Sequence, residues 1–283
     1  MAAPQNPDRA RLAARFRELR AATGLSGNRF AQRLDWVQSR VSKLETGVQI
    51  PTEADIAAWV EHTDAGADAA TELATLLERA RVEYSTWKDA YRKAGGAGGK
   101  QADIRQLERG AARIAGFQPA VIPGLLQTPA YARELLTLPC GPLAYAASEG
   151  DLDAMVAERI KRQEVLYQGG KQVQLMMGEA ALHASVGTVG TLVGQLDRLA
   201  MVAGLSGVEV GIVPFATPVL PVSGFDLYDI DLVVVETLTG EQRLDEPQEV
   251  AHYVRFFDQL RDTAATGPDS VALIQRVAAQ LRG

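Results

Sequence analysis

Five side chains with hydrogen-bonding or charged groups are clustered within six residues of the chain. They are Gln38, Ser39, Arg40, Ser42 and Lys43. The apolar residues Val37, Val41 and Leu44 recur among them at every third or fourth position, which predicts a short helix with one buried face and one polar face. A Gln amide can pair with adenine and a Lys can reach the acceptors of guanine. The polar face therefore suits contact with base edges in the major groove of DNA.

Gln38, Ser39 and Lys43 are the residues that we expect to contact bases. Further candidates for DNA contact, chiefly to phosphates, are Arg40, Arg29, Arg33, Asn28 and Ser42. The alternative is a helix face that is only solvated, and the local charge argues against it. Residues 8–50 carry nine Lys/Arg against four Asp/Glu, a net charge of +5. Since the whole chain has a net charge of −6, the remaining residues carry a net charge of −11.

Another short helix is predicted on the N-terminal side of this polar-faced helix, so that the polar-faced helix is the second of the two along the chain. Ser26 suits its N-cap, and Phe30, Ala31 and Leu34 form its apolar face. Asp35 and Trp36 fill the turn between the two helices. Two short helices joined by a tight turn make a helix-turn-helix motif, in which the second helix enters the major groove.

Arg20 and Glu45 are expected to form an ion pair. Arg20 lies in an amphipathic helix predicted from about Arg9 to Thr23, and Glu45 ends the recognition helix. In this kind of bundle the two segments lie side by side. A partly buried pair of this kind has a structural role, and losing one partner should destabilise the bundle more than losing both.

The sequence predicts two domains joined by a linker. Residues 1–8 are expected to be a disordered tip, and 9–93 to form an all-α DNA-binding bundle whose last helix runs from about Ala67 to Lys93. The glycine-rich segment 94–100 is expected to be a flexible linker. Residues 101–283 are expected to form an α+β domain, because helix-like segments surround strand-like runs at 173–177, 208–214, 224–230 and 232–238. We expect its sheet to be small and mostly antiparallel.

Sequence signatures of catalysis are weak. The three histidines lack metal-ligand spacing, and the single cysteine, Cys140, rules out a site with several Cys ligands, so we expect no enzyme activity, metal or cofactor. No apolar run is long enough for a membrane span and no signal peptide is evident, which favours a cytoplasmic location. Phe215, Phe225 and Tyr228 are candidates for lining an effector pocket, although such aromatics more often belong to a core.

Residues 9–62 resemble the repressor-type helix-turn-helix family of phage repressors and Xre-like regulators. The resemblance rests on Arg20, on GLS (24–26), on QSRVSKLETG (38–47) and on Pro51. It implies base contacts at Gln38, Ser39 and Lys43 and an ion pair between Arg20 and Glu45. Two positions depart from the family pattern: Gly27 replaces a Gln that contacts phosphate, and Val37 replaces a Ser or Thr cap.

The remainder of the chain resembles the C-terminal domain of actinobacterial WhiJ-like developmental regulators and antitoxin-like regulators of Scr-type systems. The segment IPGLLQTPAYAR (122–133) is the most specific part of this resemblance. It implies a transcription factor that binds a small partner protein encoded nearby.

Together these features predict a DNA-binding transcriptional regulator, expected to be a homodimer on a pseudo-palindromic operator. Its C-terminal domain would receive a small partner protein or an effector. Two alternatives remain open. The first is an antitoxin-like interaction module with secondary DNA binding, suggested by Gly27 and Val37. The second is a repressor that senses a small molecule.

Overall fold

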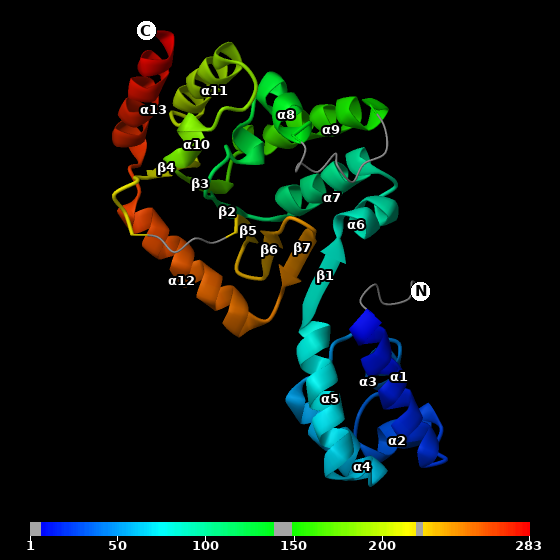
Figure 1. The fold of residues 1–283 in the computed structure, drawn as a ribbon. Helices are drawn as coiled ribbons and strands as arrows, with labels where there is room; N and C mark the ends of the chain where they lie inside the picture. The colour runs from blue at the N-terminus through cyan, green and yellow to red at the C-terminus, as the bar shows by residue number, and fades with distance from the viewer. Residues whose placement is uncertain (1–6, 139–148, 219–222) are drawn as a thin grey trace. The chain divides into compact units, whose positions relative to one another are not determined.

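The computed structural model describes residues 7–138, 149–218 and 223–283, and the chain divides after Tyr84 into two compact units (Figure 1). Of the predicted N-terminal tip, residues 1–6 lie outside the described ranges, and Pro7 already begins a helix. Within the described ranges, no helix combines the length and the apolar character needed to cross a membrane.

The N-terminal unit is a bundle of five helices: α1 (Pro7–Ala22), α2 (Gly27–Arg33), α3 (Gln38–Glu45), α4 (Glu53–Thr63) and α5 (Gly66–Arg81). Local capping explains where α4 begins, because the Thr52 hydroxyl accepts from the Asp55 backbone N–H and the Asp55 carboxylate accepts from the Thr52 backbone N–H. The core forms around the fully buried Trp59, whose ring contacts those of Phe16 and Phe30 edge to face. The ring centroids are 4.6 and 4.7 Å apart.

The long helix predicted for residues 67–93 is wrong in its second half. After α5 the chain forms strand β1 (Val82–Thr86), and a new helix, α6 (Trp87–Lys93), follows. Thr86 is the N-cap of α6, and its hydroxyl accepts from the Asp89 backbone N–H. The division between the units therefore falls after Tyr84 rather than at 94–100.

The glycine-rich segment is part of the packed fold and not a flexible linker. Gly95 and Gly96 have φ values of 74° and 116° and end α6, and α7 (Ala97–Gly110) begins directly afterwards. A side chain at Gly99 would place its Cβ 1.8 Å from the Ala94 carbonyl oxygen, and one at Gly98 would lie 3.1 Å from the Ala154 Cβ. These glycines allow close packing of backbones, which composition alone does not distinguish from flexibility.

The C-terminal unit is α+β, as predicted, and its seven-stranded sheet has the order β1-β7-β6-β5-β2-β3-β4. The strands after β1 are β2 (Arg113–Gln118), β3 (Gln172–Gly178), β4 (Val208–Val213), β5 (Phe225–Tyr228), β6 (Leu232–Glu236) and β7 (Gly240–Leu244). The sheet is mixed rather than mostly antiparallel, because β3 pairs in parallel with both β2 and β4. Helical crossovers between these strands make parallel pairing possible.

Helices cover both faces of this sheet. The crossover after β2 contains η1 (Gly124–Leu126), α8 (Pro129–Leu136), α9 (Glu149–Arg162) and η3 (Gln163–Tyr167), and the crossover after β3 contains α10 (Ala180–His183) and α11 (Val189–Val202). The chain ends in α12 (Pro247–Thr263) and α13 (Gly267–Arg282). The main core joins one sheet face to α11 and α13, whereas Phe225 on the opposite face packs on Tyr253 and Phe256 of α12.

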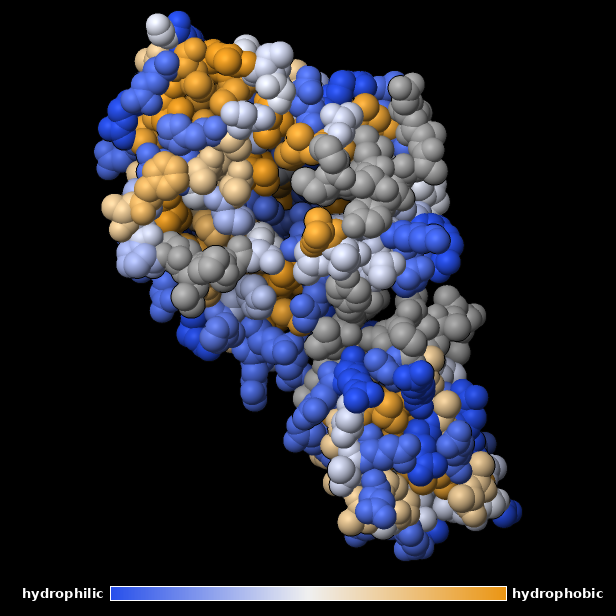
Figure 2. All heavy atoms as spheres, viewed as in Figure 1, coloured by the Kyte–Doolittle hydropathy of each residue, from blue (hydrophilic) through white to orange (hydrophobic). Residues whose placement is uncertain are grey.

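The surfaces of the two units differ in the view of Figure 2. Hydrophobic residues are visible around α11 in the C-terminal unit, whereas the visible face of the N-terminal unit is mainly hydrophilic. Large exposed apolar side chains on or next to α11 include Val189 and Met201.

Candidate nucleic-acid interface and a polar cavity

Helices α2 and α3 are joined by the predicted tight turn. Ser26 caps α2 by accepting from the Arg29 backbone N–H at 3.4 Å. Asp35 takes a left-handed conformation with φ 56°, and the Trp36 backbone N–H then returns to the Ala31 carbonyl at 2.8 Å. Because Asp tolerates this conformation better than most residues, the turn closes without a glycine.

The inner faces of α2 and α3 are buried as predicted, with one exception. Phe30 and Val41 have no exposed surface, and Leu44 is 1% exposed. Val37, which we expected inside, is 69% exposed, because it is the N-cap residue of α3 and lies before the helical periodicity begins. It also provides no side-chain cap, so the first N–H groups of α3 lack a side-chain partner at that position.

The three predicted base-contacting residues lie together on the exposed side of α3. Gln38, Ser39 and Lys43 are all exposed, and so are Asn28 and Arg29 on α2. The same face therefore offers an amide, a hydroxyl and an ammonium group on a helix that is held from behind by buried residues. This arrangement can donate to and accept from base edges in a groove.

Arg40 and Arg33 differ from the expected picture of free phosphate-binding cations. The Arg40 guanidinium donates to the buried carboxylate of Asp55 at 2.6 Å and lies 4.2 Å from the centre of the Trp36 ring. Arg33 forms a long, exposed ion pair with Asp64 at 4.0 Å. Ser42 is only half-exposed. Arg40 thus supports the packing of α3 on α4, a role that the sequence did not indicate.

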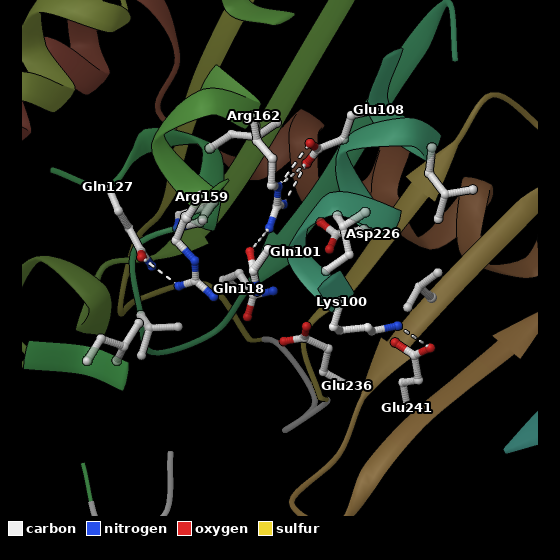
Figure 3. Close-up of a pocket in the computed structure, with 18 of the residues that line it drawn as sticks. Lys100, Gln101, Glu108, Gln118, Gln127, Arg159, Arg162, Asp226, Glu236 and Glu241 are labelled. Carbon is white, nitrogen blue, oxygen red and sulfur yellow. Dashed lines mark hydrogen bonds and ion pairs between the residues drawn. The ribbon is translucent and has the colours of Figure 1, made fainter. Parts of the chain in front are cut away.

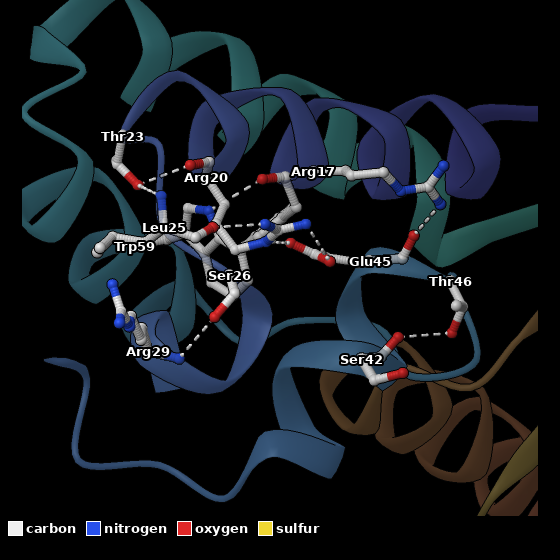
Figure 4. Close-up of polar contacts among 11 residues, drawn as sticks. Arg17, Arg20, Thr23, Leu25, Ser26, Arg29, Ser42, Glu45, Thr46 and Trp59 are labelled. Atoms are coloured by element: carbon white, nitrogen blue, oxygen red, sulfur yellow. Dashed lines mark hydrogen bonds and ion pairs between the residues drawn. The ribbon is translucent and has the colours of Figure 1, made fainter. Parts of the chain in front are cut away.

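Arg20 and Glu45 form the ion pair that the sequence predicts (Figure 4). Arg20 Nε and Nη2 donate to the two carboxylate oxygens of Glu45 at 2.5 and 3.1 Å, and Nη1 donates to the Leu25 carbonyl at 2.8 Å. Arg17, which the sequence analysis missed, donates to the Glu45 carbonyl at 2.6 Å. Two arginines of α1 thereby hold the C-terminal end of α3, where cations also favour the helix dipole.

The three effector-pocket candidates do not form one site. Phe215 is exposed, and Phe225 lies under α12. Tyr228 alone lines a cavity of about 310 Å³ on the opposite face of the sheet, because residues three apart on a strand point to opposite faces. The cavity lies within the C-terminal unit, among β2, β5, β6, β7 and helices α7 and α9.

The cavity is lined by charged groups that sequence analysis did not identify, and Figure 3 shows them converging. Arg162 donates from Nε and Nη2 to Glu108 and from Nη1 to Gln101, at distances of 2.6 to 3.1 Å. Lys100 pairs with Glu241 at 2.6 Å, and both are buried. In the sequence, Arg162 belongs to a charged helix that is typical of a solvated surface.

Burial and neighbouring charges shift the pKa values of these groups. Burial, with the adjacent Arg162 cation, lowers the pKa of Arg159 to about 10. Burial alone would lower the pKa of Arg162, but the Glu108 carboxylate raises it above its usual range. Burial and the Glu236 carboxylate raise the pKa of Asp226 to about 7, against the effect of Arg162.

A glycine makes room for the Asp226 carboxyl. Gly116 on β2 is paired with Asp226 on β5, and a Cβ at Gly116 would lie 2.5 Å from Asp226 Oδ1. The carboxyl therefore occupies space above the sheet that any other residue at this position would fill.

Comparison with known proteins identifies two regions. Residues 11–76 match a family described as a helix-turn-helix domain, and residues 101–276 match a family described as a domain of unknown function, DUF5753. A search of curated proteins finds no match. One similar solved structure is TrmBL2, described as an archaeal chromatin protein with a novel mode of DNA binding. The similarity covers 76% of this chain and 69% of that chain, at 12% identity and a TM-score of 0.29.

Proposed function

Because the chain belongs to the DUF5753 family and carries a helix-turn-helix domain at its N-terminus, we propose that it is a sequence-specific DNA-binding transcriptional regulator. The observation that supports this most directly is the exposed group of Gln38, Ser39 and Lys43 on α3, backed by the buried Val41 and Leu44. The proposal includes the repressor-type, Xre-like mode of binding, in which α3 lies in the major groove of a pseudo-palindromic operator bound by a homodimer. It includes no catalytic step.

A gel-shift or footprinting assay on the upstream region of the protein's own operon tests the proposal. We expect a specific, salt-sensitive shift, because phosphate contacts release counterions. Gln38→Ala and Lys43→Ala should each weaken specific binding by roughly 1–3 kcal/mol. Arg79→Ala is the matched control, since it removes an exposed cation of the same unit away from α3. The absence of a specific shift at low salt would contradict the proposal.

The C-terminal unit is proposed to regulate DNA binding. One candidate signal is a small partner protein, as in the WhiJ-like and antitoxin-like regulators. Val37, which provides no side-chain cap for α3, and Gly27, which replaces a phosphate-contacting Gln, favour this antitoxin-like alternative. Co-purification with a small protein encoded nearby, without DNA binding, would support it. The second candidate is a small molecule, which the cavity beside Arg159 and Asp226 favours.

A further inference from the structure

Two arginines that line the cavity from α9 differ in what their guanidinium groups bind. Arg162 uses its Nε–Nη2 edge for Glu108 and its Nη1 for the amide oxygen of Gln101. Arg159, three residues earlier, likewise uses Nη1 for a glutamine, Gln127, at 2.8 Å. Its own Nε–Nη2 edge has no hydrogen-bond partner among the described residues, and its Nε is fully buried.

An unpaired edge on a buried arginine is costly. The residue is only 9% exposed, and a buried charge normally has both an opposite charge and filled hydrogen-bond positions. Arg162 shows in the same cavity which group fits that edge, because the carboxylate of Glu108 occupies it in a bidentate manner. The vacant edge of Arg159 therefore matches a carboxylate that none of the described residues provides.

Two carboxylates of the cavity also lack a direct partner. The side chains of Asp226 and Glu236 line the cavity and make no hydrogen bond or ion pair with the described residues. In Figure 3 Arg159 and Gln127 lie on one side, and Glu236 lies on the other with Lys100 and Glu241. Lys100 Nζ and Arg243 Nε both donate to Glu241, at 2.6 and 3.1 Å, and among the described residues neither makes a hydrogen bond or ion pair with Glu236.

Apolar side chains occupy much of the remaining wall, including Ile122, Leu125, Leu136 and Val234. A volume of about 310 Å³ is at the lower end of the range for small-molecule sites. The cavity thus combines a cation that has a vacant edge, two carboxylates that lack a direct partner and a partly apolar wall. A ligand that carries one anionic and one cationic group would pair with both kinds of charge.

We propose that this cavity binds a small zwitterion, whose carboxylate pairs with Arg159, whose protonated amine lies near Asp226 and Glu236, and whose apolar chain packs against the apolar side chains of the wall. A singly charged carboxylate balances Arg159, whereas Arg162 and Arg243, which also line the cavity, already pair with glutamates. A phosphate would add a second negative charge near Glu236, and is disfavoured for that reason. The inference deepens the proposed regulatory role and rests on it only for the effect of the ligand on DNA binding.

The test uses four matched probes and the full-length protein, with binding measured by calorimetry and by the shift of thermal unfolding. Two of the probes, 6-aminohexanoate and norleucine, are isomeric zwitterions, whereas hexanoate lacks the amine and hexylammonium lacks the carboxylate. We expect at least one zwitterion to bind about tenfold more tightly than either single-charge probe, since each of those lacks one charge-assisted contact.

Two variants test the contacts to the carboxylate and to the amine of the ligand, and a third is a control. Arg159→Lys keeps the positive charge but loses the planar edge, and should weaken zwitterion binding about tenfold. Glu236→Gln alters an exposed side chain, so folding should be retained; it should weaken zwitterion binding and leave hexanoate binding no weaker. Arg255→Gln, on the exposed surface of α12, is the matched control and should leave all affinities unchanged.

The inference is overturned if neither zwitterion binds, if hexanoate or inorganic phosphate binds as tightly as the zwitterions, or if binding survives both Arg159→Lys and Glu236→Gln. A gel shift on the same samples separates the two proposals. Operator binding without any zwitterion binding removes this inference alone. Zwitterion binding without operator binding contradicts the proposed function alone.

Discussion

Each unit of the molecule contains an arginine that binds both oxygens of a glutamate, and the surroundings of the two pairs differ. In the N-terminal unit every nitrogen of the Arg20 guanidinium has an acceptor: Glu45 takes two and the Leu25 carbonyl takes the third. In the C-terminal unit Arg162 is equally saturated, but Arg159 beside it is not.

The difference shows how one kind of contact can serve two purposes. A saturated pair that packs two helices together fixes a surface, and here that surface is the outer face of α3. A saturated pair beside an unsaturated cation holds the walls of a cavity while leaving a donor edge for a ligand. The number of unused donors, rather than the presence of an ion pair, therefore separates the structural network around Arg20 from the proposed binding site around Arg159.

The largest effect is expected for the pair buried in the cavity. Glu108→Gln leaves Arg162 charged, buried and without its carboxylate, and should lower the free energy of unfolding by roughly 3–5 kcal/mol. Urea denaturation of the C-terminal unit's transition measures this. Glu164→Gln, a nearby exposed glutamate, is the control and should change stability little. Equal effects of the two variants would show that burial does not distinguish this pair.

A pH effect of intermediate size is expected from Asp226. Its pKa of about 7 in the folded chain lies above the ordinary value of 3.8, so the folded state holds this proton more tightly than the unfolded state. The contribution of this carboxyl is therefore most favourable at low pH, and it is lost as pH rises from about 4 to about 7. The difference in unfolding free energy between wild type and Asp226→Asn should show this slope, on the order of 2 kcal/mol after allowance for water in the cavity. A pH-independent difference would contradict it.

The pair in the N-terminal unit should show an effect of similar size and a characteristic non-additivity. Glu45→Ala should destabilise this unit by about 2 kcal/mol, because it leaves a partly buried guanidinium without its carboxylate. The double variant Arg20→Met with Glu45→Ala should be less destabilised than Glu45→Ala alone, since no unpaired charge remains. Thermal unfolding of both variants measures this, with the exposed Glu61→Ala as the control. Additive losses would rule out the proposed coupling.

The smallest effect is expected where α3 begins. Val37→Ser supplies the missing side-chain cap and removes an exposed apolar group, and should stabilise the N-terminal unit by up to about 1 kcal/mol. Because a firmer α3 presents Gln38 in a more fixed position, operator affinity should rise slightly in the same variant. The matched change Val48→Ser replaces another exposed valine outside the cap and should lack the gain in stability. An equal gain in stability in both variants would contradict the prediction, because the gain would then not come from the cap.

The N-terminal unit could be predicted well because its information is local. The buried stripe through Val41 and Leu44, the Ser26 cap and the Arg20–Glu45 pair all follow from spacing or from family resemblance. Val37 was misplaced because the inward periodicity was extended by one residue into the cap.

The C-terminal unit could be predicted only in part because its information is non-local. Strands β3, β4, β5 and β6 are rich in apolar residues and were found, whereas β7 has the sequence GEQRL and carries no strand pattern. Its Glu241 is buried by pairing with Lys100, 141 residues away along the chain. Arg159 and Arg162 likewise look like an ordinary charged helix face until the sheet places Glu108 and Gln127 against them.

The pairing of Gly116 with Asp226 has a consequence for how this cavity can change over time. The absence of a side chain at position 116 leaves the space above the sheet that the Asp226 carboxyl fills, because a single methyl group there would collide with this carboxyl. One substitution on β2 would therefore push the acidic group out of place without touching α3. The chain could in this way lose or alter the proposed ligand preference while the proposed operator recognition stayed the same, so that the two could evolve separately.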